Sequence, residues 1–266
     1  MLRKHAKIEP ERFYYHCDQL GMLVWQDMVN GGSAYKHWFV TYLATLMNWN
    51  HISFSDDEKH AGLLSRLHPE GKDEFRREIT ETIAFLYNHP SIVVWVPFNE
   101  GWGQFDALAA CEQIRTLDSS RLVDHASGWF DQKGGDILSL HYYFLKLKFK
   151  PESKRAAALT EFGGYSLSIP GHSCCKKVYG YKKFNSTGTL TYGYIDLIRQ
   201  TILPAVKKGI GATVYTQLSD IEEETNGIYT YDREICKIDP DTLRKWNRAL
   251  KEAGECKTYA DHTTDH

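Results

Sequence analysis

The sequence lacks the features that would place it in several large classes of protein. No apolar run among its 266 residues reaches the roughly 18 that a membrane span needs, and no signal peptide opens the chain. The formal net charge is only −2, so no global positive field attracts nucleic acid. The six cysteines form no CxxC pair and have no histidines at zinc-finger spacing. We therefore predict a cytoplasmic protein with reduced thiols that binds neither membrane nor nucleic acid.

What the chain does contain is a series of short apolar runs that alternate with helical patterns. Helices are expected over 10–20, 73–88, 104–117, 191–208 and 240–253. Buried strands are expected over 22–25, 92–98, 121–123, 137–140, 156–159 and 211–215. Runs that are apolar on both faces and alternate with helices imply a parallel sheet. No Pro-rich or Ser-rich linker divides the pattern, so we expect one α/β domain over 1–253, followed by a polar tail over 254–266.

Polar side chains follow almost every expected strand. Asn99 and Glu100 end the run 92–98, His141 ends 137–140, and Glu161 follows 156–159. Active sites of (β/α)8 TIM barrels collect at these carboxyl ends of the strands. A doubly wound sheet would instead carry a phosphate-binding glycine loop, and the only candidate, Gly101-x-Gly103, follows a glutamate that repels phosphate. The pattern favours the TIM barrel.

Two of these strand-end residues, Glu100 and Glu161, are carboxylates 61 residues apart (161 − 100). If the strand 22–25 is the third of a barrel, they end the fourth and the seventh, where both can point at one atom in the mouth. A pair of carboxylates about 5 Å apart is what retaining glycoside hydrolysis requires, because one donates a proton while the other attacks the sugar. Each glutamate could also be an ordinary surface residue beyond a strand.

Five blocks of the sequence resemble the barrel of family 2 glycoside hydrolases, in the right order. They are RFYYHCDQLGMLVWQDM (12–28), NHPSIVVWVPFNE (88–100), DILSLHYY (136–143), LTEFGG (159–164) and NGIYTYDRE (226–234). The resemblance covers residues 1–250 and implies a retaining mechanism that needs no metal and no cofactor. It assigns Glu100 as the acid/base and Glu161 as the nucleophile.

The resemblance also implies a set of substrate-side residues. Asn99 matches the asparagine that binds the sugar 2-hydroxyl, and Tyr143 matches a tyrosine that hydrogen-bonds the nucleophile. Arg3 matches an arginine beneath the nucleophile that favours its ionised form. The remaining candidates near the substrate are His141, His125, Trp102 and Trp129. For each histidine a purely structural role is the alternative.

The chain also departs from the family pattern. Members carry two β-rich domains before the barrel, and Met1 here falls inside the second barrel strand, so the first βα unit has no counterpart. We expect a fragment or a truncated gene product with reduced stability or activity, because a barrel without one unit has two open edges. The long segment 29–72 is expected to be a solvated loop with some helix over 35–47.

Other departures bear on the substrate. Ala6 stands where many members have a histidine on strand two, and Gln26-Asp27 stands where they have an acidic pair after strand three. The tryptophan that often forms the floor of the sugar site is also missing, so Tyr215 or Gln217 must take its place. Glu224 stands where glucuronidases have an Asn-x-Lys clamp, and it would repel a substrate carboxylate. These residues favour a neutral β-hexoside, a galactoside before a mannoside or a glucoside.

Three hypotheses follow. The first is a retaining exo-β-glycosidase that binds carbohydrate, with homo-oligomerisation left open. The second is an inactive barrel remnant that at most binds carbohydrate. The third, an aldolase-like barrel, lacks a lysine at a strand end and a phosphate site. Measuring the turnover of aryl β-hexosides distinguishes the first hypothesis from the second.

Overall fold

The computed structural model describes residues 1–36, 38–49, 52–143 and 147–260. The chain divides into two compact units. Unit 1 comprises Met1–His141 and Glu152–Ala156, and unit 2 comprises Tyr142–Pro151 and Ala157–His266. Each unit is described by itself.

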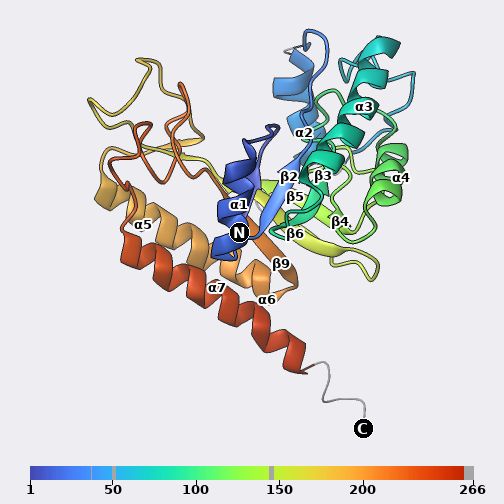
Figure 1. Cartoon of the computed structure of the whole chain (residues 1–266). Coiled ribbons are helices and arrows are strands. Elements are labelled where there is room, and N and C mark those ends of the chain that lie inside the picture. Colours follow the sequence, from blue (N-terminus) through green and yellow to red (C-terminus); the bar gives the residue numbers. More distant parts are fainter. Residues whose placement is uncertain (37, 50–51, 144–146, 261–266) are drawn as a thin grey trace. The chain divides into compact units, whose positions relative to one another are not determined.

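Unit 1 is built on a parallel sheet whose strand order, β1-β2-β3-β4, follows the chain. Its strands are β1 (Leu2–Lys4), β2 (Val24–Asp27), β3 (Ile92–Val96) and β4 (Leu122–Val123), and β5 (Ile137–Tyr142) follows them. The helices between them are α1 (Glu11–Leu20), α2 (Ala44–Trp49), α3 (Pro69–Leu86) and α4 (Ala107–Leu117), with α3 and α4 side by side (Figure 1). An order without reversal is that of a barrel wall, because a doubly wound sheet reverses direction at a switch point.

Local sequence signals determine α1 and α3. Pro10 precedes α1, and Gly21 closes it in the left-handed conformation (φ 62°), which glycine adopts without a steric penalty. α3 begins at Pro69, four residues before the predicted start, because proline is well suited to a first helical turn. The apolar residues on one stripe of α3 are all buried: Phe75, Ile79, Ile83 and Leu86.

The core of unit 1 lies between the sheet and the helices α1, α3 and α4. Trp95 on β3 is fully buried, and its indole N–H donates to Asp118 (2.9 Å) at the end of α4. Among the apolar residues of the predicted helix 104–117, Phe105, Cys111 and Ile114 are buried, whereas Leu108 and Ala109 are exposed. The helix starts at Ala107 rather than at the predicted residue 104.

Segment 29–72 is only partly the solvated loop that we expected. A π-helical turn over Phe39–Leu43 runs into α2, and Phe39, Ala44 and Leu64 form a small buried cluster with Phe130. Residues 37, 50 and 51, which belong to this segment, lie outside the described residues.

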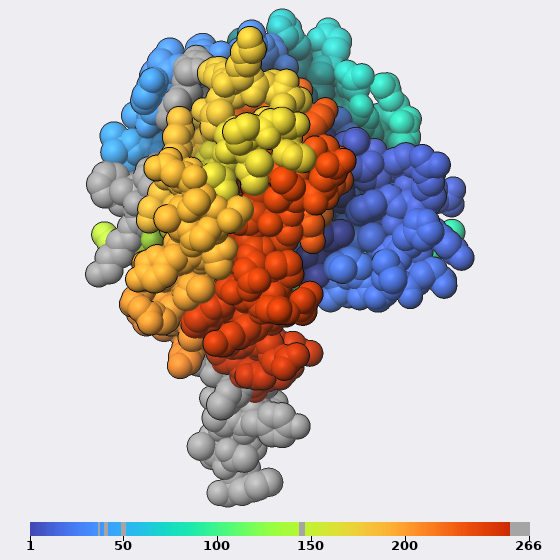
Figure 2. All heavy atoms as spheres, turned by 90° about the vertical axis from the view of Figure 1, so that its left-hand side faces the viewer, coloured from blue at the N-terminus to red at the C-terminus, as the bar shows by residue number. Residues whose placement is uncertain are grey.

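Unit 2 contains a parallel pair, β6 (Ala156–Gly163) with β9 (Ile210–Thr216), and a short pair, β7 (Tyr165–Ser166) with β8 (Lys182–Lys183). A helical rod of α5 (Thr187–Leu197), a π-helical turn (Ile198–Ile202) and α6 (Leu203–Lys207) connects β8 to β9. Helix α7 (Pro240–Ala260) packs along this rod, and Figure 2 shows it in red beside α5 in orange.

The helices predicted in unit 2 were too short. The rod starts at Thr187 because Ser186 forms a capping box with Thr189, whereas we predicted a start at 191. Helix α7 extends beyond the predicted end at 253, into the predicted polar tail. Among residues 1–260, excluding the short stretches not described, no helix is both long and apolar enough to cross a bilayer.

Candidate active site

The end of strand β3 presents Glu100 on a backbone that few residues adopt. Glu100 has a φ of 52°, and Gly101 and Gly103 follow with φ of 71° and 64°. The Glu100 N–H donates to the carbonyl of Ser127 (2.9 Å), and a Cβ on Gly101 would lie 2.3 Å from the ring of Phe130. A non-glycine residue in this region costs on the order of 1–3 kcal/mol and is most often found at functional sites. The turn therefore holds Glu100 in one specific orientation.

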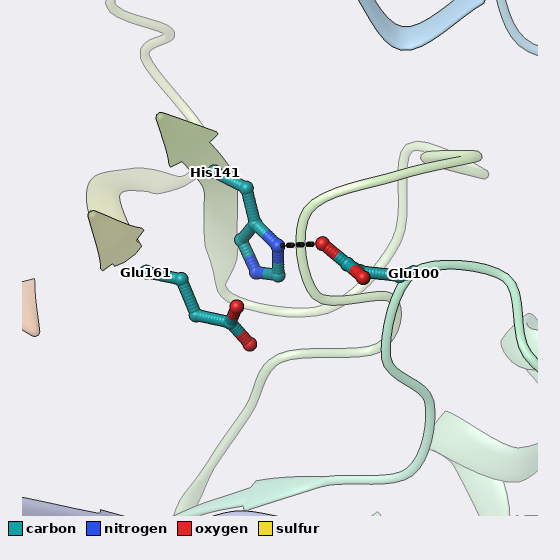
Figure 3. Close-up of side chains that lie close together, drawn as sticks. All are labelled: Glu100, His141 and Glu161. Carbon is teal, nitrogen blue, oxygen red and sulfur yellow. Dashed lines mark hydrogen bonds and ion pairs between the residues drawn. The ribbon is translucent and has the colours of Figure 1, made fainter. Parts of the chain in front are cut away.

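The carboxylate of Glu100 is paired with His141 from β5. His141 Nδ1 lies 2.8 Å from Glu100 Oε1. Figure 3 marks this contact with a dashed line. The imidazole is 2% exposed and the glutamate side chain 16% exposed, so water screens this contact weakly. The other ring nitrogen, Nε2, is hydrogen-bonded to Ser127 Oγ (3.2 Å). His141 was predicted to be near the substrate, and the structure places it against the predicted acid/base.

Arg3, on β1, organises a second polar group in unit 1. Its guanidinium donates two hydrogen bonds to the Asp27 carboxylate (3.0 and 2.9 Å) and one to Asn99 Oδ1 (2.9 Å). Burial raises the pKa of Asp27, but Arg3 and His5 outweigh this effect and hold the pKa below its ordinary value. Because Arg3 can only donate, it orients the Asn99 amide so that its NH₂ group is available to a ligand.

In unit 2, Glu161 lies on β6 (Figure 3) and accepts a hydrogen bond from the phenol of Tyr143. The same phenolic oxygen is hydrogen-bonded to Thr216 Oγ1 (3.2 Å) at the end of β9. The ring of Tyr181 stacks on that of Tyr143, with 4.1 Å between centroids and 20° between planes. A hydrogen bond donated to a carboxylate favours its ionised form, which is the form that a nucleophile needs.

The two predicted tryptophan platforms differ in accessibility. Trp102 is 42% exposed and its ring lies 4.9 Å from that of Tyr35, so an open aromatic face follows β3. Trp129 packs against the small buried cluster that contains Phe39 and Phe130. Trp102 is therefore the better candidate for contact with a sugar ring.

His125 was also predicted to lie near the substrate, but the structure places it in the interior. It is 1% exposed, its Nε2 lies 3.1 Å from Asp131, and the same nitrogen accepts the backbone N–H of Gln132 (3.0 Å). These contacts support the alternative of a structural role for this histidine.

The end of β9 carries the residues expected to bear on specificity. The Tyr215 hydroxyl is buried without a hydrogen-bond partner among the described residues, and burial raises its pKa. Gln217 donates both amide hydrogens, to Glu224 (3.1 Å) and to Asn226 (2.7 Å). Of the two residues proposed to replace the tryptophan, Gln217 is the one positioned by polar neighbours.

Sequence reasoning missed three residues of these groups. Ser127 lies past β4, and counting every polar residue after a strand, rather than the first two, would have included it. Thr216 is the last residue of β9. Tyr181 lies in the loop that leads to β8, and no local pattern marks it.

One further cluster in unit 2 could hold a divalent metal ion. Ligand atoms of His172, Asp232 and Glu234 lie within 4.8 Å of one another. His172 Nδ1 is already paired with Asp232 (2.7 Å), and Glu234 is 72% exposed. The cluster is on the surface, and the prediction that no metal is needed stays a prediction.

Comparison with known proteins decides the family. The family described as "Glycosyl hydrolases family 2, TIM barrel domain" matches residues 9–203 of the chain. The chain belongs to family 2 of the glycosyl hydrolases. The resemblance inferred from the five sequence blocks and the TIM-barrel fold are thereby confirmed.

Relatives of the chain differ in the substrates that their names give. A β-mannosidase B from Thermothelomyces thermophilus is 32% identical over 94 residues, which is 35% of this chain and 8% of that protein. A β-galactosidase from Leuconostoc mesenteroides is 26% identical over 263 residues, covering 93% of this chain and 22% of that protein. The chain thus spans less than a quarter of the length of these relatives.

Solved structures of other enzymes share the fold. A β-D-glucuronidase from Dictyoglomus thermophilum superposes with a TM-score of 0.61 at 14% identity, covering 92% of this chain and 44% of that one. A β-galacturonidase from Eisenbergiella tayi superposes with a TM-score of 0.56 at 18% identity, covering 91% of this chain and 44% of that one. At such identities the likeness supports the barrel fold and not the substrate.

Proposed function

We propose that the protein is a retaining exo-β-glycosidase that hydrolyses neutral β-hexosides, with Glu100 as acid/base and Glu161 as nucleophile. The observation that carries this proposal is that the two glutamates have different partners. Glu100 is paired with the nitrogen of a buried imidazole, whereas Glu161 accepts a phenolic hydrogen bond from Tyr143. Two carboxyl groups in different surroundings can hold one proton between them, which a double displacement requires.

In the proposed reaction, Glu161 attacks the anomeric carbon while protonated Glu100 gives its proton to the departing oxygen. Water then enters, Glu100 takes one of its protons, and the glycosyl–Glu161 bond breaks to release a β-configured sugar. The Asn99 NH₂ group, oriented by Arg3, donates to a sugar hydroxyl. Such a contact contributes to catalysis when it strengthens in the transition state.

The residues at the end of β9 support a neutral sugar. Glu224 brings a negative charge next to Gln217, so a substrate carboxylate there would face repulsion rather than a cation. The β-galactosidase relative covers nearly the whole chain, whereas the β-mannosidase match covers about a third of it. We therefore propose a β-galactoside as the first substrate to test, before a β-mannoside and a β-glucoside.

The test is turnover of aryl β-galactoside, β-mannoside, β-glucoside and β-glucuronide by the full chain and by Glu161→Gln and Glu100→Gln. We expect one neutral substrate to be cleaved and the Glu161→Gln variant to be inactive. Proton NMR of the first product should show the β-anomer. A crystal structure with a substrate analogue should show the two carboxyl groups about 5 Å apart.

Glu81→Gln is the matched control, because Glu81 is 68% exposed on α3. It should retain full activity. Absence of turnover by a folded wild-type chain on all four substrates would support the alternative, a barrel remnant that at most binds carbohydrate. An α-configured first product would instead contradict the retaining mechanism.

A further inference from the structure

Segment 29–72, which was expected to be a solvated loop, supplies a buried arginine to unit 1. Arg66 is only 8% exposed. Its Nε donates to the carbonyl of Gly103 (2.8 Å). One terminal nitrogen donates to the carbonyl of Gly71 (3.1 Å), and the other donates to Asn30 Oδ1 (3.0 Å). All three nitrogens of the guanidinium therefore have an oxygen partner, and none of these three oxygens belongs to a carboxylate.

Two buried aromatic rings also contact this guanidinium. Its central carbon lies 5.2 Å from the ring centroid of Phe75 on α3 and 5.3 Å from that of Phe105, which precedes α4. A buried cation is costly unless its donors are used, and Arg66 uses two of them on main-chain carbonyls. Because a guanidinium presents its donors in a rigid fork, it can hold a backbone segment in one place.

The backbone that Arg66 holds is the turn that follows Glu100. Arg66 binds the carbonyl of Gly103 directly. Asn30, which accepts from Arg66, donates from its side-chain amide to the carbonyl of Trp102. Two successive carbonyls of the turn are thus fixed by one arginine and its asparagine partner, both from segment 29–72.

The turn is held at its other end as well. The backbone N–H of Glu100 donates to the carbonyl of Ser127 (2.9 Å). Gly103 is packed so closely that an added Cβ would lie 2.3 Å from the carbonyl oxygen of Gly31. Glu100 therefore lies between an anchor after β4 and the anchor that Arg66 provides.

We propose that Arg66 is a positioning residue that holds the turn after Glu100 and so aims the proposed acid/base at the substrate. The inference rests on the proposed function for the role of Glu100, and on the hydrogen bonds alone for the hold on the turn. Glu100 must reach the leaving oxygen in the first step and water in the second. A displacement of about 1 Å can lower a rate roughly a hundredfold. Loosening the turn should therefore weaken the steps that need proton transfer by Glu100.

The first test compares two leaving groups on the hexoside that the wild type cleaves. Phenol needs a proton to leave, whereas dinitrophenol leaves without one. Arg66→Lys keeps the charge but loses the fork. It should lower kcat/KM about 10- to 100-fold for the phenyl glycoside. For the dinitrophenyl glycoside it should lower kcat/KM by less than about threefold, because the attack by the nucleophile is spared. Arg77→Lys, at a site 64% exposed on α3, is the matched control and should resemble wild type on both substrates.

The second step gives an independent readout. For the dinitrophenyl glycoside, kcat should fall in Arg66→Lys, because hydrolysis of the glycosyl-enzyme needs Glu100 as a base. Azide is a nucleophile that needs no base. Its nitrogen bonds to the anomeric carbon as the ester bond to Glu161 breaks, so azide should restore kcat and yield a β-glycosyl azide. Equal losses of kcat/KM on both substrates, without rescue by azide, would show a merely structural role and would overturn the inference.

Hydrogen exchange tests the hold on the turn without activity. The N–H of Trp102 is bonded to the carbonyl of Asn99 (3.0 Å), and that of Gln104 to the carbonyl of Gly101 (3.3 Å). Their exchange, followed by NMR, should become about tenfold faster in Arg66→Lys and stay unchanged in the control. Unchanged exchange would overturn the inference. A wild type without turnover would overturn the proposed function and leave the exchange result standing.

Thermal melting establishes that each variant is folded before these comparisons. If Arg66→Lys does not fold, Asn30→Ala carries both tests, because Asn30 is only partly buried. It removes the bond to Trp102 and one partner of Arg66, so the same leaving-group dependence and faster exchange are expected. Asn88→Ala is its matched control, since Asn88 is exposed in unit 1. Wild-type behaviour of Asn30→Ala in both tests would also overturn the inference.

Discussion

Tyr143 and Glu161 are joined by a hydrogen bond that runs from the phenol to the carboxylate at Oε2. Two neighbours keep Tyr143 in place, because Thr216 bonds the same oxygen and Tyr181 stacks on its ring. Residues from β9 and from the loop before β8 therefore hold the phenol that donates to Glu161.

Replacing Tyr143 with phenylalanine should lower activity and alter its pH dependence. A hydrogen bond to a charged group contributes about 1.5–3 kcal/mol, so kcat/KM should fall roughly 10- to 150-fold. The acidic limb of the profile should move to higher pH, because the ionised nucleophile loses a donor. Tyr192→Phe is the control, since Tyr192 is 70% exposed. An unmoved acidic limb would show that this bond does not act on the nucleophile.

Gly164→Ala should disturb the same tyrosine by steric overlap. A Cβ at Gly164 (φ 63°) would lie 2.4 Å from the Tyr181 ring and 3.1 Å from the Tyr143 ring. Gly21→Ala is the control, because Gly21 has nearly the same φ of 62° and nothing within 4 Å of the added Cβ. In both variants the alanine at positive φ lowers the stability by about 1 kcal/mol. Only Gly164→Ala should lose activity, by tenfold or more, and equal losses would contradict the steric argument.

Lys237→Met should destabilise the protein strongly. The buried ammonium donates to Asp220 (2.7 Å) and to the carbonyls of Thr225 (2.8 Å) and Leu167 (2.9 Å). Removing one partner of a buried ion pair leaves the other charge uncompensated, at a cost of about 3–5 kcal/mol. Urea unfolding measures this loss, and Lys251→Met, at a site 76% exposed, is the control. A loss below about 1 kcal/mol would mean that water reaches Asp220.

Asp124→Asn should change how stability depends on pH. Burial raises the pKa of Asp124 from its ordinary 3.8 to about 6, so between these values the folded state binds more protons than the unfolded state. The free energy of unfolding contributed by this group therefore falls as the pH rises from 4 to 6, and the penalty is complete above that range. The difference between the two pKa values corresponds to about 3 kcal/mol.

The variant does not titrate, so it should gain about 3 kcal/mol relative to wild type between pH 4 and pH 7. Chemical denaturation of both proteins across this range measures the gain, and Asp73→Asn, at a site 76% exposed, should show none. Parallel stability curves for wild type and Asp124→Asn would show that Asp124 is already hydrated or paired.

The sequence predicted elements well where their signals are local. The apolar run on β3, the proline and glycine that bound α1, and the stripe of α3 all depend on neighbours in the chain. The start of α4 was wrong for the opposite reason. Its first N–H, at Ala107, is capped by the carboxylate of Asp56 (3.0 Å), and Gln104 bonds the same carboxylate instead of joining the helix. No pattern near α4 reveals a cap that lies so far away in the chain.

By itself the sequence determined the family, the barrel fold and the two glutamates at strand ends, because these depend on apolar runs and on the residues that follow them. Only the tertiary structure distinguished two histidines that look alike in sequence. His141 contacts Glu100, whereas His125 is buried against Asp131. The difference arises because a side chain at a strand end is oriented by residues from other strands, and those contacts form only when the chain folds.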